Sequence, residues 1–238
     1  LNFQLARLLY RQVTTAGHYD ADAWLTAYLD FMGTPGRHRD TYVEECHRGF
    51  FTRLAEGIPP RLCGIEDVHI GGLAAVPALF AALPGIQLSD LRAIVATHVG
   101  LTHRHPRVLK AADTLVRLLA AVAAGEPLQQ AIETQAADWI TPQRLRDWSR
   151  EDDRDVVGLR LSPACYIDQA FPAALYLAWK YHDDFTVGIT ANARVGGDNC
   201  HRGAVVGSLL GLALGVPEAW LTGLKDPPER ATSSPLTP

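Results

Sequence analysis

Residues that could bind a metal ion or an anion follow a glycine pair late in the sequence. Gly196 and Gly197 precede Asp198, and Cys200 and His201 follow it after one intervening residue, Asn199. The glycines allow the backbone to approach a ligand, and the three side chains would share the first turn of the next helix, near its positive dipole end. A metal or an anionic ligand could bind there. The carboxylate of Asp198 could equally serve only as the N-cap of that helix.

A polar loop earlier in the chain carries a second set of candidate contacts. Asp67 and His69 lie within it, and Gly71 and Gly72 end it. Loops carry binding residues more often than the elements they connect, so we expect this loop to contact a ligand. An ordinary turn would explain the same residues.

A third candidate group surrounds a predicted helix start. The helix is expected to begin at Asp40 or Thr41, with Glu44 in the position of a capping box and with His47 and Arg48 following. These residues combine carboxylates with an imidazole and a guanidinium. Helix capping and an i,i+4 charge pair between Glu44 and Arg48 would account for them without a ligand.

Histidines that precede another predicted helix form a fourth group. His98 is followed by His103 and His105, and Pro106 suits the first turn of the helix. Histidines can bind a metal, but at a helix start they more often cap the helix or face solvent, so we expect at most a supporting role. The aspartates at 152–155 alternate with arginine and are typical of a solvated loop.

The helices that must position these groups can be read from the periodicity of the apolar residues. This periodicity predicts an all-α fold, a compact multi-helix single domain. No run of alternating residues indicates a strand. Glycines at 203, 207, 211 and 215 would let the last long helix pack closely at the centre. We expect a domain over 1–225, a disordered tail over 226–238, and loops over 59–72 and 149–155. The predicted helices are 1–13, 24–33, 40–54, 73–82, 89–97, 106–124, 127–136, 142–148, 168–181 and 200–214.

Composition places the 238-residue chain among ordinary globular proteins, with 47% hydrophobic and 20% charged residues. A formal net charge of -4 provides no basic surface for nucleic acid. No apolar run is long enough to cross a membrane and no leader is visible, so we expect a cytoplasmic protein with reduced thiols. Because Leu1 already lies inside a helical pattern, we expect the natural chain to begin upstream.

Several segments give the chain a resemblance to the ADP-ribosylglycohydrolase family, which includes dinitrogenase-reductase-activating glycohydrolases and J1-crystallin relatives. Phe-Pro-Ala-Ala-Leu-Tyr at 171–176 precedes Val-Gly-Gly-Asp at 195–198 and Val-Pro-Glu-Ala-Trp at 216–220. This order is similar to the family's Gly-Gly-Asp-Thr-Asp-Thr segment and the Pro-x-x-Trp after it. The His-Arg-His-Pro junction at 103–106 also resembles the family, and the similarity runs from near Leu1 to about Leu224.

The resemblance implies an all-α hydrolase that holds a pair of Mg²⁺ ions, or Mn²⁺, in a central cleft. Its substrate would be an ADP-ribosylated protein or a small ADP-ribose conjugate, whose N- or O-glycosidic bond at the ribose is hydrolysed. Asp198 would be a metal ligand, and Asp40 matches the place of another site aspartate. Asp40, the glycines at 196 and 197 and the loop over 67–72 would border the substrate.

The sequence departs from the family pattern after Asp198, where Asn199, Cys200 and His201 replace Thr-Asp-Thr. Thiol and imidazole ligands favour Zn²⁺ over Mg²⁺, so we expect a degenerate metal site with zinc as a minor alternative. The family's Thr-Asp-Asp segment would fall just before Leu1. The alternative function is a non-catalytic ADP-ribose-binding or crystallin-like structural protein. The sequence assigns no catalytic residue, acceptor or oligomeric state.

Overall fold

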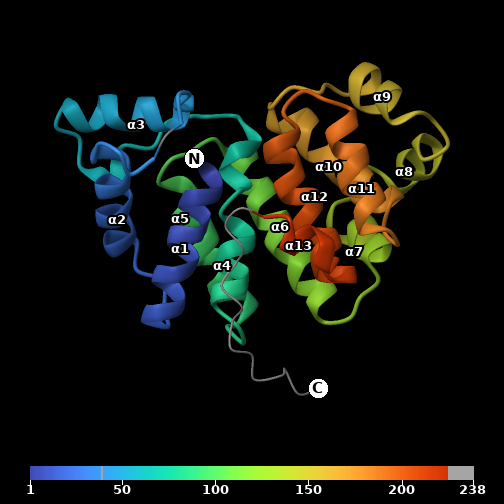
Figure 1. The fold of residues 1–238 in the computed structure, drawn as a ribbon, viewed down its shortest axis with the longest axis horizontal. Coiled ribbons are helices and arrows are strands. Elements are labelled where there is room, and N and C mark those ends of the chain that lie inside the picture. The colour runs from blue at the N-terminus through green and yellow to red at the C-terminus, as the bar shows by residue number, and fades with distance from the viewer. Residues whose placement is uncertain (39, 225–238) are drawn as a thin grey trace.

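The computed structural model describes residues 1–38 and 40–224 and confirms the all-α prediction. Within those ranges the chain forms helices and short helical turns (Figure 1), and its extended pairing is limited to isolated bridges from Ile65 to His103 and from His69 to Tyr166. The tail predicted over 226–238 lies outside the described residues.

The first two helices are joined by a tight turn. The left-handed Gly17 ends α1 (Asn2–Ala16), and its N–H bonds to the carbonyl of Val13. The Asp20 side chain then caps α2 (Ala21–Gly33) by accepting from two backbone N–H groups. The next helix, α3 (Glu45–Ala55), lies near α2 at one end of the molecule (Figure 1). This arrangement brings the start of α1 toward the start of α3.

The remaining elements complete the bundle, and most long helices fall within a few residues of their predicted ranges. Val205 and Leu209 on the glycine-rich helix α12 are fully buried, which confirms its central position. The elements are η1 (Pro60–Leu62), η2 (Ile70–Leu73), α4 (Val76–Ala82), α5 (Leu88–Gly100), α6 (Pro106–Ala123), α7 (Leu128–Gln135), α8 (Pro142–Trp148), α9 (Asp153–Asp155), η3 (Val156–Arg160), α10 (Ile167–Lys180), α11 (Phe185–Arg194), α12 (Asn199–Leu214) and α13 (Glu218–Thr222).

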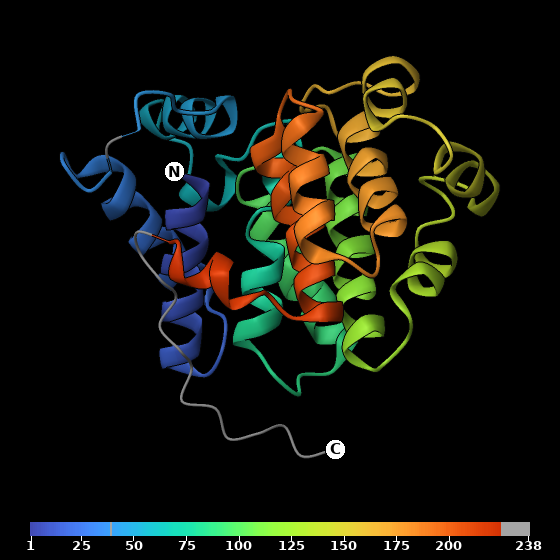
Figure 2. The same ribbon diagram turned by 45° about the vertical axis from the view of Figure 1, so that its right-hand side comes forward.

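The glycines of α12 explain how closely it approaches its neighbour α11. A Cβ atom added at Gly203 would lie 2.8 Å from the side-chain amide of Asn192, and one added at Gly207 would lie 3.4 Å from Ile189. In Figure 2 the orange helices α11 and α12 run alongside each other in front of the green helices, and α12 also packs on α6 and α10. Close packing therefore offsets the low helix propensity of glycine.

Three predicted boundaries are wrong. The helix expected from Asp40 begins at Glu45, because the Glu44 carboxylate turns toward another part of the protein and caps no backbone group. Arg48 bonds to the carbonyl of Val43 instead of pairing with Glu44. The predicted loops contain short helical turns: η1 falls within 59–72, η2 begins there at Ile70 and ends at Leu73, and α9 falls within 149–155. The sequence reading also missed α11, which carries few large apolar residues.

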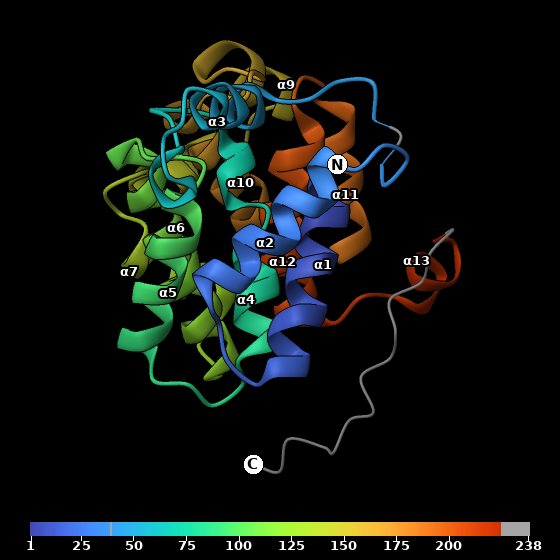
Figure 3. The same ribbon diagram turned by 90° about the vertical axis from the view of Figure 1, so that its left-hand side faces the viewer.

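The last described element, α13, stands on the outside of the bundle (Figure 3). The indole N–H of Trp220 donates to the hydroxyl of Thr186 at 3.1 Å, and the Trp220 ring meets Phe185 edge-on. These contacts attach α13 to the start of α11. No helix among residues 1–38 and 40–224 is long and apolar enough to cross a membrane.

Candidate functional site

A pocket with a volume of about 320 Å³ lies where the starts of α3 and α12 meet the loop before η2. Its walls bring together side chains that are far apart in the sequence, and most of them are acidic or imidazole groups. The lining residues are Tyr42, Glu44, Glu45, Asp67, His69, Gly71, Cys165, Asp198 and His201. The pocket thus brings together residues of three candidate groups from the sequence: the polar loop before Gly72, the predicted helix start around Glu44, and the segment that follows the Gly196-Gly197 pair.

The imidazole of His201 lies between two carboxylates in this pocket. Its Nε2 is 2.9 Å from Oε1 of Glu44, and its Nδ1 is 2.9 Å from both oxygens of Asp198. Asn2, at the start of α1, donates to the Glu44 carboxylate at 2.9 Å. The amide nitrogen of Asn2 also approaches Nε2 of His201 at 2.7 Å, but the charge of Glu44 favours a protonated ring that donates to the carboxylate.

These contacts change the pKa values of all three ionisable groups. Burial alone would lower the pKa of His201, but its hydrogen bonds to Asp198 and Glu44 raise that pKa to about 10. Burial would raise the pKa of Glu44, but the bond to His201 lowers it to about 2. Burial would also raise the pKa of Asp198, but the hydrogen bonds and the charge of His201 together outweigh burial and lower that pKa. At neutral pH the cluster is therefore an imidazolium held between two carboxylates.

A second pair of functional groups, Asp67 and His69, lines the same pocket. Oδ1 of Asp67 accepts from the backbone N–H of His69 at 2.8 Å and lies 2.8 Å from Nδ1 of its ring. Asp67 is almost fully buried, whereas the His69 side chain is 28% exposed. The carboxylate therefore orients an imidazole whose other nitrogen faces away from it.

Backbone hydrogen bonds hold the loop that carries this pair from both sides. Ile65 pairs with the 102–104 segment, since its N–H donates to Thr102 and its carbonyl accepts from Arg104. Farther along, the N–H of Ile70 donates to the carbonyl of Cys165 at 2.8 Å. The loop is thus a fixed wall of the pocket even though it contains little regular structure.

The Gly196-Gly197 pair forms the turn that aims Asp198 at the pocket. Both glycines have left-handed backbone conformations, with φ of 74° and 64°. A Cβ atom at Gly197 would collide with the carbonyl of Pro163, which accepts the N–H of Asp198 at 2.9 Å. The pair thus allows close backbone contact, and Asp198 caps α12 as predicted by accepting from the N–H of His201.

The other predicted site residues lie at varied distances from this cluster. Gly71 lines the pocket, and Gly72 packs against the ring of His103 just behind it. Cys200 is exposed and does not line the pocket. Asp40 is also exposed, with its carboxylate 3.0 Å from the backbone nitrogen of Leu1. Asp198 and His201 therefore meet Asp67 and His69 in one pocket, without Asp40 or Cys200.

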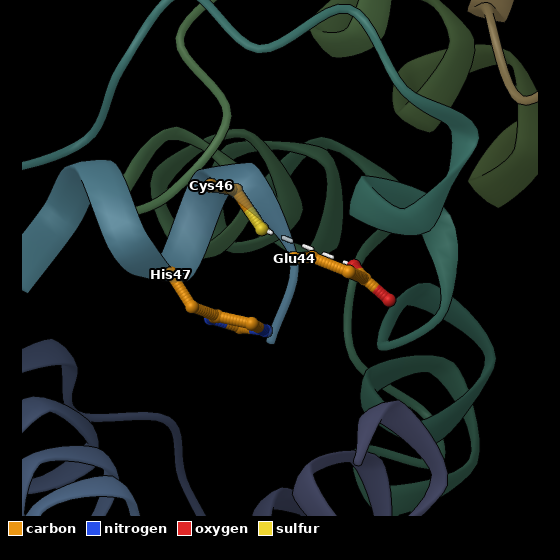
Figure 4. Close-up of side chains that lie close together, drawn as sticks. All are labelled: Glu44, Cys46 and His47. Atoms are coloured by element: carbon orange, nitrogen blue, oxygen red, sulfur yellow. Dashed lines mark hydrogen bonds between the residues drawn. The ribbon is translucent and has the colours of Figure 1, made fainter. Parts of the chain in front are cut away.

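The sequence placed Glu44 in the third candidate group, where helix capping would also account for it, and it gave no role to Asn2. Figure 4 shows Glu44, Cys46 and His47 together at the start of α3, with the sulfur of Cys46 turned toward the Glu44 carboxylate at 4.0 Å. His47 and Cys46 are both buried, and the phenol of Tyr28 lies 2.8 Å from Nδ1 of His47. The run of ionisable residues at 44–48 was the feature of the sequence that could have indicated Glu44 as a site residue.

The fold and pocket define an all-α protein with an acidic and imidazole-rich site at the start of a glycine-rich helix. Comparison with protein families matches residues 2–236 to ADP-ribosylglycohydrolase. The chain belongs to this family, which confirms the resemblance noted in the sequence. Comparison with curated proteins finds no match.

Proposed function

We propose that this protein hydrolyses the N- or O-glycosidic bond that joins ADP-ribose to an acceptor, in the pocket lined by Glu44 and Asp198. The acceptor would be a side chain of an ADP-ribosylated protein or a small molecule. The observation that carries the proposal is that an ionised carboxylate pair and an imidazole oriented by Asp67 line the same pocket. Membership of the ADP-ribosylglycohydrolase family supports the substrate class.

The carboxylates would stabilise the transition state. Glycosidic cleavage develops positive charge at the anomeric carbon of the sugar, and a fixed negative charge beside that carbon lowers the barrier. Glu44 suits this role because its pKa of about 2 keeps it ionised. The same low pKa makes it a weak base, so another group would have to accept the proton of the attacking water.

His69 would serve as that general base. With a proton on Nδ1 donated to Asp67, its Nε2 carries a lone pair that can take a proton from water. Asp67 then acts as the positioning residue, since it holds the ring and stabilises the imidazolium that forms. The water would attack the anomeric carbon and form the new C–O bond as the bond to the acceptor breaks. The proton that His69 takes from this water would then pass to the leaving nitrogen or oxygen of the acceptor, which regenerates the neutral imidazole.

The residues at this position do not fit a pair of Mg²⁺ ions. Such ions need several oxygen ligands at about 2.1 Å in octahedral geometry. Here the ring of His201 fills the space between Glu44 and Asp198 and contacts both carboxylates. We propose that its charge takes the place of a cation. Metal binding by Asp198, Cys200 and His201 together stays a prediction, which metal analysis would test.

Release of free ADP-ribose from peptides modified on arginine or serine tests the proposal. The unaltered protein should release ADP-ribose from at least one peptide, and Glu44→Gln should lower the rate by about 100-fold or more. Glu56→Gln, at the exposed end of α3, is the matched control and should leave the rate unchanged. Absence of release, or activity that survives Glu44→Gln or Asp198→Ala, would contradict the assignment.

A non-catalytic ADP-ribose-binding role is the second candidate, because both ring nitrogens of His201 already contact carboxylates within the protein. Calorimetric titration with ADP-ribose separates the two functions. Binding without release from either peptide would favour a binding protein, and absence of binding would favour a structural one.

A further inference from the structure

We propose that Cys46, Asp67 and His103 form a binding site for one Zn²⁺ ion, at the inner wall of the pocket where Asp67 lines it and next to the His201 cluster. Their ligand atoms all lie within 4.8 Å of one another. The three residues come from the start of α3, the loop before η2 and the segment before α6. Each is at least 95% buried, with exposed fractions of 1%, 5% and 4% respectively.

His103 supplies the observation that points to a ligand. Its Nδ1 lies 2.9 Å from the hydroxyl of Thr102, which fixes the ring, while its buried Nε2 has no hydrogen-bond partner among residues 1–38 and 40–224. A buried polar atom without a partner costs free energy, so it calls for an explanation. This Nε2 is directed into the space shared with the thiol of Cys46 and the carboxylate of Asp67.

The distances suit zinc better than a hydrogen bond. Nε2 of His103 lies 3.6 Å from Oδ1 of Asp67, which is too long for a hydrogen bond. Two ligand atoms of a tetrahedral zinc ion, each at about 2.0–2.1 Å from the metal, lie about 3.4 Å apart. The imidazole and carboxylate therefore need to move by only a few tenths of an ångström to bind the same ion.

The donor set selects the type of metal. Thiolate sulfur, imidazole nitrogen and carboxylate oxygen together favour Zn²⁺, whereas Mg²⁺ requires oxygen ligands. Three protein ligands leave a fourth position for water or for the Glu44 carboxylate, which is 4.0 Å from the sulfur of Cys46. The ion would bind Cys46 as a thiolate, so binding would release the thiol proton to solvent.

The surroundings hold these ligands in place before any ion binds. The 65–67 segment is tied to the 102–104 segment through the backbone of Ile65. The Asp67 carboxylate is oriented by the ring and the backbone N–H of His69. Gly72 leaves room for the ring of His103, because a Cβ atom there would lie 2.8 Å from it. Such outer contacts are what orient metal ligands in zinc proteins.

Zinc analysis of the purified full chain, after dialysis against a chelator and titration with zinc chloride, tests the site. We expect one tightly bound ion per chain. Cys46→Ala and His103→Gln should each weaken binding by more than about 100-fold, since removal of an outer-shell partner alone costs up to that factor. Cys200→Ser is the matched control and should bind zinc normally, because Cys200 is exposed and outside the cluster.

Replacement of zinc by cobalt gives a readout that does not depend on activity. The unaltered protein and Cys200→Ser should show sulfur-to-cobalt charge-transfer absorption and intense tetrahedral visible bands, and Cys46→Ala should lose the charge-transfer band. Circular dichroism verifies that each variant is folded. Absence of stoichiometric zinc binding by the unaltered protein would overturn the proposal. So would zinc binding that survives Cys46→Ala or is abolished by Cys200→Ser.

Discussion

Replacing His201 by glutamine should destabilise the protein strongly, and the loss should depend on pH. The variant His201→Gln removes the positive charge between Glu44 and Asp198 and leaves two carboxylates close together. All three side chains are less than one-fifth exposed, so water screens this repulsion only partly.

The pKa values set the magnitude of this loss. The pKa of His201 rises from an ordinary 6.5 to about 10, which at about 1.4 kcal/mol per pH unit corresponds to about 5 kcal/mol. The pKa of Glu44 falls from 4.5 to about 2, which corresponds to about 3 kcal/mol. Both shifts report the same contacts and are not additive. The imidazolium therefore contributes about 3–5 kcal/mol to the free energy of unfolding near neutral pH.

The sign of the pH dependence follows from the direction of each shift. A raised pKa in the folded protein stabilises it fully below the unfolded value of 6.5, and this contribution is lost as pH rises through about 10. The lowered pKa of Glu44 makes its contribution present above 4.5 and lost as pH falls through about 2. The difference between the unaltered protein and His201→Gln should therefore be largest near pH 6 and shrink toward pH 10.

Urea denaturation of both proteins at about pH 6, 8 and 10 measures this difference. His18→Gln is the matched control, because His18 is exposed and contacts the nearby carbonyl of Ala16 at the end of α1. That control should leave stability nearly unchanged at every pH. A His201→Gln loss below about 1 kcal/mol at pH 6, or one that stays constant to pH 10, would refute the imidazolium assignment.

Three further predictions concern the turn, the core and the proposed base. Gly197→Ala should lower the free energy of unfolding by about 2 kcal/mol or more and Gly17→Ala by about 1 kcal/mol, measured by thermal or urea unfolding. Both glycines are left-handed, but only a Cβ atom at Gly197 would meet a neighbouring carbonyl, so equal losses would contradict this. In the same assay, Leu209→Ala should lower the free energy of unfolding by about 3–5 kcal/mol, whereas Leu212→Ala should lower it by under about 1 kcal/mol because Leu212 is partly exposed. Similar losses for the two variants would argue against a central position of α12. His69→Ala should slow ADP-ribose release by about 100-fold or more, and an unchanged rate would exclude it as the general base.

Helix periodicity was sufficient to predict most of the fold because the apolar residues repeat at helical spacing on the long helices. The central helix α12 could be anticipated from its glycine ridge, which faces α11 at Gly203 and Gly207. The start of α3 was misplaced because the local capping pattern at 40–44 competes with a long-range contact. Glu44 bonds to Asn2, which is 42 residues away, and no local rule can anticipate that.

The candidate site could be predicted only in part, for the same reason. The glycine-aspartate turn identified Asp198 and His201, and the polar loop identified Asp67 and His69. These residues lie in one pocket because α12 packs against η2 and because of the path of the non-helical segment that leads into α3. Asp67 and His103 come from two segments that the Ile65 bridge holds together, and Cys46 comes from a third segment, the start of α3. Such contacts join residues that are far apart in the sequence, so residue spacing does not predict them.

The magnesium dependence of ADP-ribose release tests the central claim most directly, namely that His201 takes the place of a cation in a hydrolytic pocket. The measurement compares initial rates of the unaltered protein on a modified peptide without added magnesium and with magnesium chloride raised to millimolar concentrations. We predict a measurable rate that is the same throughout. A rate that is absent without magnesium and saturates as magnesium is added would contradict the claim.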